Sequence, residues 1–255
     1  MLLHGAISDA RVWRRQMEEL SDEFTVVAWD APGAGRSSDP PEPFGMAEWA
    51  DALAGFLGAL ELGPAHVLGL SWGGSLALEL FSRHPEAAAS LILADTYAGW
   101  KGSLPAAECA ERLDMALHTS TMPPDELVSR WLPELLSGAA SPELAHELAS
   151  IMSDFHPVGL RLMAHAMADA DLRNVLPEIQ VPTLLLWGDH DERSPLSIAE
   201  GMRAAIPNAK LAVIPGAGHD SNIEQPIRFS AEVRDFCRSV AAPPEARQAA
   251  EPRGL

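Results

Sequence analysis

The sequence predicts an α/β fold with a mostly parallel sheet, flanking helices and an inserted helical region. Short apolar runs alternate with segments of helical periodicity over residues 1–96 and again over residues 180–240. Such alternation is typical of parallel strands joined by right-handed crossovers. Residues 97–179 contain no strand-like run but several helical ones. We therefore expect a core built from residues 1–96 and 180–240, interrupted by an all-helical insertion at 97–179.

The apolar runs and the helical periodicities define the individual elements. We expect strands at Met1–Leu3, Phe24–Trp29, His66–Leu70, Ser90–Ala94, Thr183–Trp187 and Leu211–Ile214. We expect helices at Ala10–Leu20, Met46–Leu60, Trp72–Arg83, Ala106–Leu117, Asp125–Leu136, Pro142–Met152, Pro157–Ala168, Pro195–Ala205 and Pro226–Val240. The tail at 241–255 is rich in Ala, Pro, Glu and Arg, so we expect it to be disordered because it has little to bury.

The composition excludes several classes of partner. The 255 residues include 36 acidic side chains against 18 Lys and Arg, a net charge of −18, which argues against nucleic acid as a partner. No apolar run approaches the ~18 residues of a membrane span, so no membrane partner is expected. The first five residues do not resemble a signal peptide. Cys109 and Cys237 match neither a metal-binding motif nor a redox-active Cys-x-x-Cys motif, which favours reduced thiols and a cytoplasmic location.

A Gly-Leu-Ser-Trp-Gly pentapeptide at 69–73 follows one expected strand and opens the next helix. In this context the Gly-x-Ser-x-Gly pattern places a serine on a strained turn, with its hydroxyl above the sheet. The flanking glycines are needed because a Cβ at either position would collide with the neighbouring strand or helix. The pattern predicts that Ser71 is a nucleophile.

A serine nucleophile requires a base that a third group orients. His219 is the candidate base because it follows the last expected strand in a glycine-rich loop. That loop lies at the carboxyl edge of the sheet, where ligands bind in open α/β folds. The orienting acid should follow the preceding strand, where Asp189 and Asp191 both stand. We favour Asp191, near the apex of its loop, and Asp189 remains the alternative.

The oxyanion formed during acyl transfer requires preorganised backbone donors. We expect one from the N–H of Trp72, at a helix N-terminus where the helix dipole assists. The second is expected from the N–H of Ala6, directly after the first strand. The preceding residues, His4 and Gly5, are therefore candidates to contact the substrate.

Apolar residues of the helical insertion are the other pocket candidates. Trp131 and Phe155 are the two that we place beside the substrate. Further apolar residues in the insertion are Leu132, Met152, Leu162 and Met163. These side chains either line a hydrophobic pocket or form the insertion's own core, and the sequence supports both interpretations equally.

Together these motifs resemble the α/β-hydrolase superfamily over roughly residues 1–240. The matching motifs are His4-Gly5, Asp30-x-Pro32-Gly33-x-Gly35-x-Ser37, Gly69-x-Ser71-x-Gly73, Gly188-x-x-Asp191-x-x-x-Pro195 and Gly218-His219. The chain is also similar to the esterase and lactonase branch that includes 3-oxoadipate enol-lactonases, through Gly69-Leu70-Ser71, Leu93-Ala94-Asp95-Thr96, Asp171-Leu172-Arg173 and Val181-Pro182-Thr183. The resemblance implies an α/β-hydrolase fold and the chain order Ser, Asp, His of its triad. It also implies that residues 97–179 form a cap over the active site.

The residues and the resemblance together predict a serine hydrolase that cleaves a small-molecule carboxylic ester or lactone. No cofactor is required, and no metal is expected, since the His-Glu pair at 146–147 lacks the second histidine of a zinc motif. Some hydrolases of this fold use an aspartate nucleophile, and the serine at position 71 excludes their type of reaction for this chain. The alternatives are a cofactor-free perhydrolase or haloperoxidase, a C–C bond hydrolase, and a non-catalytic homologue that binds a small ligand.

One departure from the family concerns the N-terminal strands. The family normally has two more strands before the His4-Gly5 motif, and three residues precede that motif here. We therefore expect those strands to be truncated, with Phe24–Trp29 as an edge strand that is prone to pairing. The chain would then be less soluble or more oligomeric than an extended version, and a dimer is one option.

Overall fold

The computed structural model describes residues 1–241 and contains a five-stranded, wholly parallel sheet. The strands are β1 (Leu2–Leu3), β2 (Ala65–Leu70), β3 (Ala88–Ala94), β4 (Thr183–Gly188) and β5 (Lys210–Ile214). They lie in the order β1-β2-β3-β4-β5, so each strand pairs with its neighbours in sequence. This arrangement confirms the predicted α/β class. The expected disordered tail lies outside the described residues, apart from Ala241.

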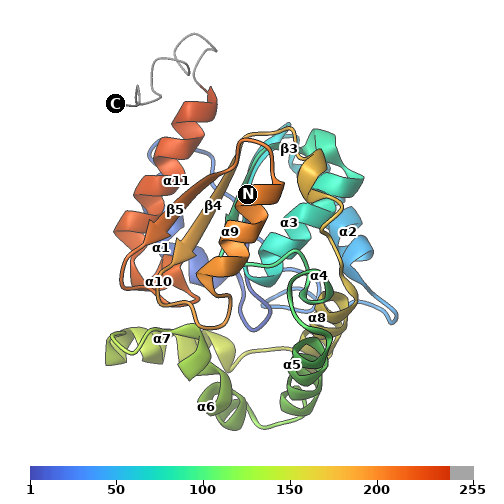
Figure 1. Ribbon diagram of the computed structural model, residues 1–255. Coiled ribbons are helices and arrows are strands. Elements are labelled where there is room, and N and C mark those ends of the chain that lie inside the picture. The colour runs from blue at the N-terminus through green and yellow to red at the C-terminus, as the bar shows by residue number, and fades with distance from the viewer. Residues whose placement is uncertain (242–255) are drawn as a thin grey trace.

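Helices cover both sides of the sheet (Figure 1). On one side, α1 (Arg14–Leu20) packs against α11 (Pro226–Ala241). On the other side, α2 (Met46–Leu60) packs against α3 (Trp72–Arg83), and α9 (Leu196–Ala205) lies over β4 and β5. Short 3₁₀ turns occur at η1 (Ala10–Trp13), η2 (Pro85–Ala87) and η3 (Leu176–Glu178). The sheet is therefore the middle of three layers.

Residues 97–179 connect β3 to β4 through helices alone, and we call this stretch the helical segment. Its helices are α4 (Trp100–Ser103), α5 (Ala106–Thr119), α6 (Pro124–Leu135), α7 (Pro142–Met152) and α8 (Pro157–Asp169). They lie together at the bottom of Figure 1, beyond the carboxyl ends of β4 and β5. The helical segment therefore covers the edge of the sheet where a ligand site is expected.

A close backbone approach joins the helical segment to the first half of the core. A Cβ added to Gly159 in α8 would lie 1.8 Å from the carbonyl oxygen of Gly33. Next to this contact, the imidazole of His156 lies 2.7 Å from an oxygen of Asp39 and 3.0 Å from the carbonyl oxygen of Gly35. Only glycine at 159 allows the two segments to approach this closely.

The predicted strand at Phe24–Trp29 is wrong. This segment forms a single parallel bridge, between Ala28 and Leu2, in which the N–H of Leu2 donates to the carbonyl oxygen of Val27 over 2.8 Å. Because β1 comprises only two residues, it offers too few partners for a longer ladder. The β-rich composition of 24–29 therefore produces extended chain rather than a strand.

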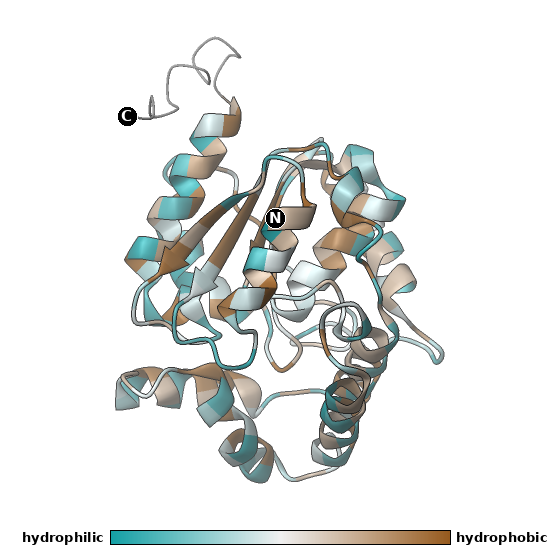
Figure 2. Ribbon diagram, viewed as in Figure 1, coloured by the Kyte–Doolittle hydropathy of each residue, from teal (hydrophilic) through white to brown (hydrophobic). Residues whose placement is uncertain are grey.

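The core follows from the apolar strands and the inner helix faces. Strands β3 and β4 are almost continuously apolar and buried, as central strands covered on both faces should be (Figure 2). The buried set includes the tryptophans at positions 13, 49, 72 and 187.

Among the described residues, no helix is long and apolar enough to cross a membrane. A short helix that was not predicted, α10 (Ser221–Glu224), directly follows His219-Asp220 and leads into α11.

Candidate active site

Ser71 occupies the turn between β2 and α3. Its backbone has a positive φ of 53°, a strained conformation that non-glycine residues adopt rarely and mostly at functional sites. The turn is tight enough that a Cβ on Gly69 would lie 2.1 Å from the carbonyl oxygen of Gly73. A Cβ on Gly73 would in turn lie 2.4 Å from the carbonyl oxygen of Leu3 in β1. Glycine at both positions is therefore needed to hold the serine in this conformation.

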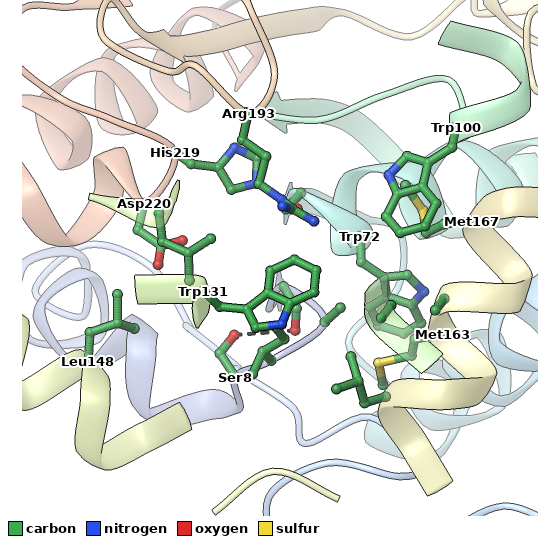
Figure 3. A pocket seen from close by; sticks show the side chains of 18 residues that line it. Ser8, Trp72, Trp100, Trp131, Leu148, Met163, Met167, Arg193, His219 and Asp220 are labelled. Atoms are coloured by element: carbon green, nitrogen blue, oxygen red, sulfur yellow. Dashed lines mark hydrogen bonds between the residues drawn. The ribbon is translucent and has the colours of Figure 1, made fainter. Parts of the chain in front are cut away.

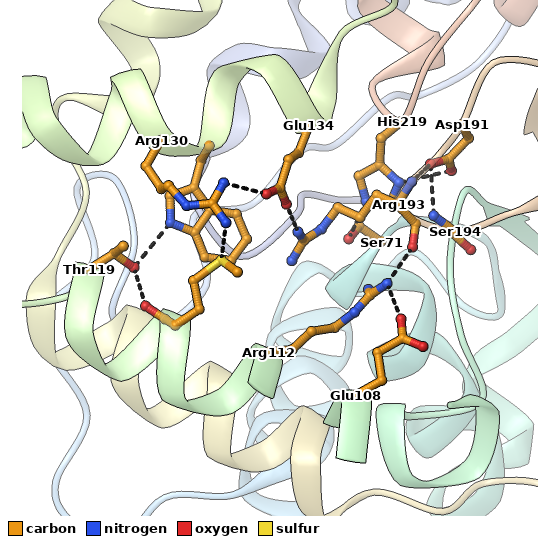
Figure 4. A network of polar contacts seen from close by, with 12 residues as sticks. Ser71, Glu108, Arg112, Thr119, Arg130, Glu134, Asp191, Arg193, Ser194 and His219 are labelled. Carbon is orange, nitrogen blue, oxygen red and sulfur yellow. Dashed lines mark hydrogen bonds and ion pairs between the residues drawn. The ribbon is translucent and has the colours of Figure 1, made fainter. Parts of the chain in front are cut away.

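The side chain of His219 lies between Ser71 and Asp191. Its Nε2 is 2.8 Å from the hydroxyl oxygen of Ser71, and its Nδ1 is 2.9 Å from a carboxylate oxygen of Asp191 (Figure 4). The carboxylate acceptor identifies Nδ1 as the protonated nitrogen, which leaves Nε2 as the acceptor for the serine proton. This tautomer is the one that a general base for serine requires.

The two candidate acids occupy different environments. The other oxygen of Asp191 accepts hydrogen bonds from the N–H groups of Arg193 and Ser194, over 2.9 and 2.8 Å, which fix the carboxylate in place. Asp189 instead accepts a hydrogen bond from the N–H of Gly216 over 2.7 Å, on a half-exposed surface. The structure thus brings Asp191, and not Asp189, together with His219.

The loops that carry the acid and the base pack directly on each other. A Cβ on Gly188 would lie 2.3 Å from the carbonyl oxygen of Gly218 and 2.4 Å from that of Ala217. The N–H of His190 also donates to the carbonyl oxygen of Ala217 over 2.9 Å. These contacts fix the imidazole relative to the carboxylate through the backbone.

Ala6 and Trp72, the two expected oxyanion donors, line the same pocket as Ser71. Trp72 is the first residue of α3, so its N–H has no partner within the helix and lies where the helix dipole is positive. The loop at 4–6 lies against Ser71, since a Cβ on Gly5 would be 3.6 Å from the Cβ of Ser71. Both residues therefore lie close to Ser71, and their role as oxyanion donors stays a prediction.

His4 holds this loop in place and does not line the pocket. It is fully buried, its Nε2 accepts from the N–H of Ala31 over 3.1 Å, and its Nδ1 donates to the carbonyl oxygen of Gly5 over 2.7 Å. Burial lowers the pKa of His4, which keeps the ring neutral. The expectation that His4 contacts substrate is therefore corrected, because both ring nitrogens are bonded to the backbone.

A pocket opens next to Ser71 between the sheet edge and the helical segment (Figure 3). Gly5 and Trp131 line it as expected, whereas Phe155 lines a separate small cavity beside Ala6 and His156. Most of its lining is apolar and includes Ile7, Trp72, Trp100, Ala116, Leu135, Leu148, Leu160, Met163, Ala164 and Met167. Of the six insertion residues proposed from sequence, only Trp131 and Met163 line this pocket.

Two charged residues that the sequence did not single out also line the pocket. The side chain of Arg193 is 9% exposed, stacks over the ring of Trp131 at 4.4 Å and pairs with Glu134 over 2.8 Å (Figure 4). Its burial lowers the pKa of the guanidinium, although arginine remains charged in proteins. The second residue, Asp220, is 7% exposed, and burial raises the pKa of its carboxyl to about 6.

A third buried carboxyl, Asp95, lies at the end of β3. It accepts a hydrogen bond from the N–H of Gly188 over 2.8 Å and bonds the hydroxyl of Ser221. Burial, followed by the charge of Asp191, raises its pKa well above the ordinary value. Asp95 thus links β3, β4 and α10 behind the site.

Among the described residues, no group of three or more His, Cys, Asp or Glu side chains could hold a metal ion.

The fold and this site define a class of protein. Residues 1–233 match the alpha/beta hydrolase family, and the chain belongs to it. A thermophilic esterase from Thermogutta terrifontis has a similar structure, with a TM-score of 0.88 and 32% identity, covering 94% of this chain and 89% of that one. The enol-lactonase from Burkholderia xenovorans has a TM-score of 0.83 and 26% identity, covering 93% of this chain and 90% of that one.

Sequence relatives are hydrolases as well. A poly(3-hydroxyalkanoate) depolymerase of Ectopseudomonas oleovorans is 32% identical over 200 residues, which cover 78% of this chain and 70% of that protein. A 3-oxoadipate enol-lactonase of Acinetobacter baylyi is 28% identical over 239 residues, covering 91% and 86%. These relatives support hydrolase activity and the esterase and lactonase branch inferred from the motifs.

Proposed function

We propose that this protein hydrolyses carboxylic esters or lactones through a covalent acyl-enzyme on Ser71. The observation that carries the proposal is the chain of short contacts from the Ser71 hydroxyl to His219 and on to Asp191. Nucleophile and base lie within hydrogen-bond reach, and a buried carboxylate orients the base, as activation of a serine requires.

In the acylation step, the Ser71 oxygen attacks the ester carbonyl carbon as its proton passes to Nε2 of His219. The Nδ1–H of His219 donates to Asp191 throughout, which stabilises the imidazolium that forms. The carbonyl oxygen becomes negative and is stabilised by the N–H groups of Ala6 and Trp72. The imidazolium then gives its proton to the leaving alcohol, and the acyl group stays on Ser71.

Water completes the reaction by the same route. His219 takes a proton from water, the resulting hydroxide attacks the acyl carbon, and the second tetrahedral intermediate is held by the same two amides. Collapse of this intermediate returns the proton to Ser71 and releases the carboxylic acid. For a lactone, the leaving alcohol belongs to the same molecule as the acid, so the product is a hydroxy acid.

In this proposal the helical segment, residues 97–179, forms a cap over a core that consists of residues 1–96 and 180–240. Support comes from the pocket, since α6, α7 and α8 contribute Trp131, Leu148 and Met163 to a cavity whose floor contains Ser71. An apolar roof excludes water and strengthens electrostatic interactions inside the site. It also favours an apolar acyl or alcohol group over a strongly charged one.

The proposal is tested by turnover of p-nitrophenyl esters of increasing chain length, beside simple and acyl-homoserine lactones, with Ser71→Ala as the control. We expect hydrolysis by the wild type, loss of at least ~10³-fold in the control, and a ranking that separates esterase from lactonase. Turnover that survives in Ser71→Ala would overturn the mechanism. A folded wild type that cleaves none of these substrates would favour a non-catalytic ligand-binding role instead.

A further inference from the structure

Asp220 is a buried carboxyl in the pocket wall that no step of the proposed reaction uses. The residue is 7% exposed, no described residue donates a hydrogen bond to its carboxylate, and the carboxylate oxygens face the pocket rather than being fully enclosed. Buried carboxylates in folded proteins are nearly always hydrogen-bonded or paired, because an unpaired buried charge is costly. The lack of a partner at this position therefore points to one that arrives with the ligand.

The carboxylate also does not take the structural role that its position offers. Asp220 is the N-cap residue of α10, where aspartate commonly accepts a hydrogen bond from the first turn of the helix, yet its side chain makes no such bond. Its backbone N–H instead donates to the carbonyl oxygen of Leu135 over 2.9 Å, which fixes the residue against α6. The backbone is thus held while the carboxylate points into the pocket.

The surroundings of Asp220 identify the position that a ligand group would take. Figure 3 shows Asp220 below His219, on the same side of the pocket as Leu148 and across from Trp100 and Met167. Leu135 and Leu148 also line the pocket, whose other polar side chains are Ser8, Ser71, Arg193 and His219. A ligand seated at Ser71 and extending toward Asp220 meets a carboxylate, the only acidic side chain of the lining.

We propose that Asp220 is a specificity-determining residue that accepts a hydrogen bond from a free hydroxyl of the substrate, so that the enzyme prefers hydroxyl-bearing esters or lactones. This inference rests on the proposed ester hydrolysis. A hydroxyl fits better than an ammonium group, because His219 becomes cationic during the reaction and Arg193 already places a guanidinium in the same pocket. A hydroxyl oxygen can also accept a hydrogen bond from the O–H of the neutral carboxyl, so a hydroxyl suits both protonation states of Asp220.

The test compares matched pairs that differ by one hydroxyl. The pairs are ethyl 3-hydroxybutyrate with ethyl butyrate, ethyl 4-hydroxybutyrate with ethyl butyrate, ethylene glycol monobutyrate with ethyl butyrate, and α-hydroxy-γ-butyrolactone with γ-butyrolactone. We expect kcat/KM to favour the hydroxylated member of at least one pair by about 10- to 100-fold in the wild type, as for a hydrogen bond to a charged group. No preference in any pair would overturn the proposal.

Three variants test whether the carboxylate of Asp220 causes the preference for the hydroxylated substrate. Asp220→Leu should lower kcat/KM for the hydroxylated member much more than for its deoxy partner, so that the preference is lost. Asp220→Asn, whose amide oxygen still accepts, should keep part of the preference. Glu192→Gln removes an exposed carboxylate from the neighbouring loop and should leave the ratio unchanged. An unchanged ratio in Asp220→Leu would overturn the proposal, because a merely structural role would alter both members of a pair alike.

A binding measurement separates this inference from the proposed function. Calorimetry on Ser71→Ala with the same pairs reports hydroxyl recognition without turnover, and we expect tighter binding of one hydroxylated member. If no ester is turned over but this preference exists and disappears in Ser71→Ala/Asp220→Leu, hydroxyl recognition holds and ester hydrolysis fails. If esters are cleaved with no hydroxyl preference, ester hydrolysis holds and the role of Asp220 fails.

Discussion

Replacement of Asp220 by asparagine should stabilise the ligand-free protein, and the gain should grow as the pH rises. The pKa of this carboxyl is raised from its ordinary value of 3.8 to about 6, mainly because burial disfavours the charged form. Between these two values the folded protein holds a proton that the unfolded chain has released. The stability contributed by the neutral carboxyl is therefore present at low pH and is lost as the pH rises toward and through 6.

The magnitude follows from the size of this shift. A difference of about two pKa units corresponds to about 3 kcal/mol of lost stability once the pH is well above 6. At pH 5 the cost is about half of this, so the change between pH 5 and pH 8 is about 1.4 kcal/mol. The charges that act on the carboxyl are those of His219, Glu224, Asp191 and Arg193.

Urea unfolding at several pH values between 5 and 8 measures this effect. The difference in unfolding free energy between Asp220→Asn and the wild type should increase by about 1.4 kcal/mol across the range. Any pH-independent effect of the amide cancels in that comparison, and Glu192→Gln, at an exposed position, should give a flat difference. A difference that does not change with pH for Asp220→Asn as well would show that the carboxylate is solvated or paired in the folded protein, and that its pKa is not raised by burial.

Three further predictions follow from the site and its supports. Asp191→Asn should lower kcat by up to ~10⁴-fold, because the required tautomer of His219 is lost. Asp189→Asn should lower kcat much less, since Asp189 does not contact His219. Steady-state kinetics that rank the two variants the other way would contradict the assignment of Asp191. Gly159→Ala should destabilise the fold by about 1–3 kcal/mol, since its Cβ would lie 1.8 Å from a carbonyl oxygen. Gly201→Ala, where a Cβ meets nothing within 4 Å, should instead stabilise α9 by up to ~1 kcal/mol. Equal melting temperatures for the two variants would count against this prediction. EDTA should leave ester turnover unchanged, because every step of the proposed acyl transfer is carried by side chains and backbone N–H groups. Inhibition by EDTA that added metal reverses would contradict this mechanism.

The elements that the sequence predicts well are those whose signal is local. The turn at 69–73 and the helix at Pro142–Met152 have their boundaries marked by glycine and proline, and the structure places both where they were expected. The strand at Phe24–Trp29 failed because strand formation depends on a partner, and the composition of a segment does not report how many residues lie beside it.

The pocket lining was harder to predict than the residues around Ser71. His219 and Asp191 stand next to strand ends, so the topology alone brings them to one edge of the sheet. Arg193 and Asp220 follow these residues in sequence but resemble ordinary loop charges, and only the folded structure shows that they are buried and line the pocket. Phe155 and Trp131 have the same apolar character, and helix packing alone decides which of the two reaches the site.

Covalent labelling is the most direct test of whether Ser71 is an activated nucleophile. The protein would be treated with a fluorophosphonate, digested and analysed by mass spectrometry, beside Ser71→Ala and a thermal-denaturation check of folding. We expect one label per chain on the peptide that contains Ser71, with no label on the variant. A folded wild type that stays unlabelled, or a label on another residue, would contradict it.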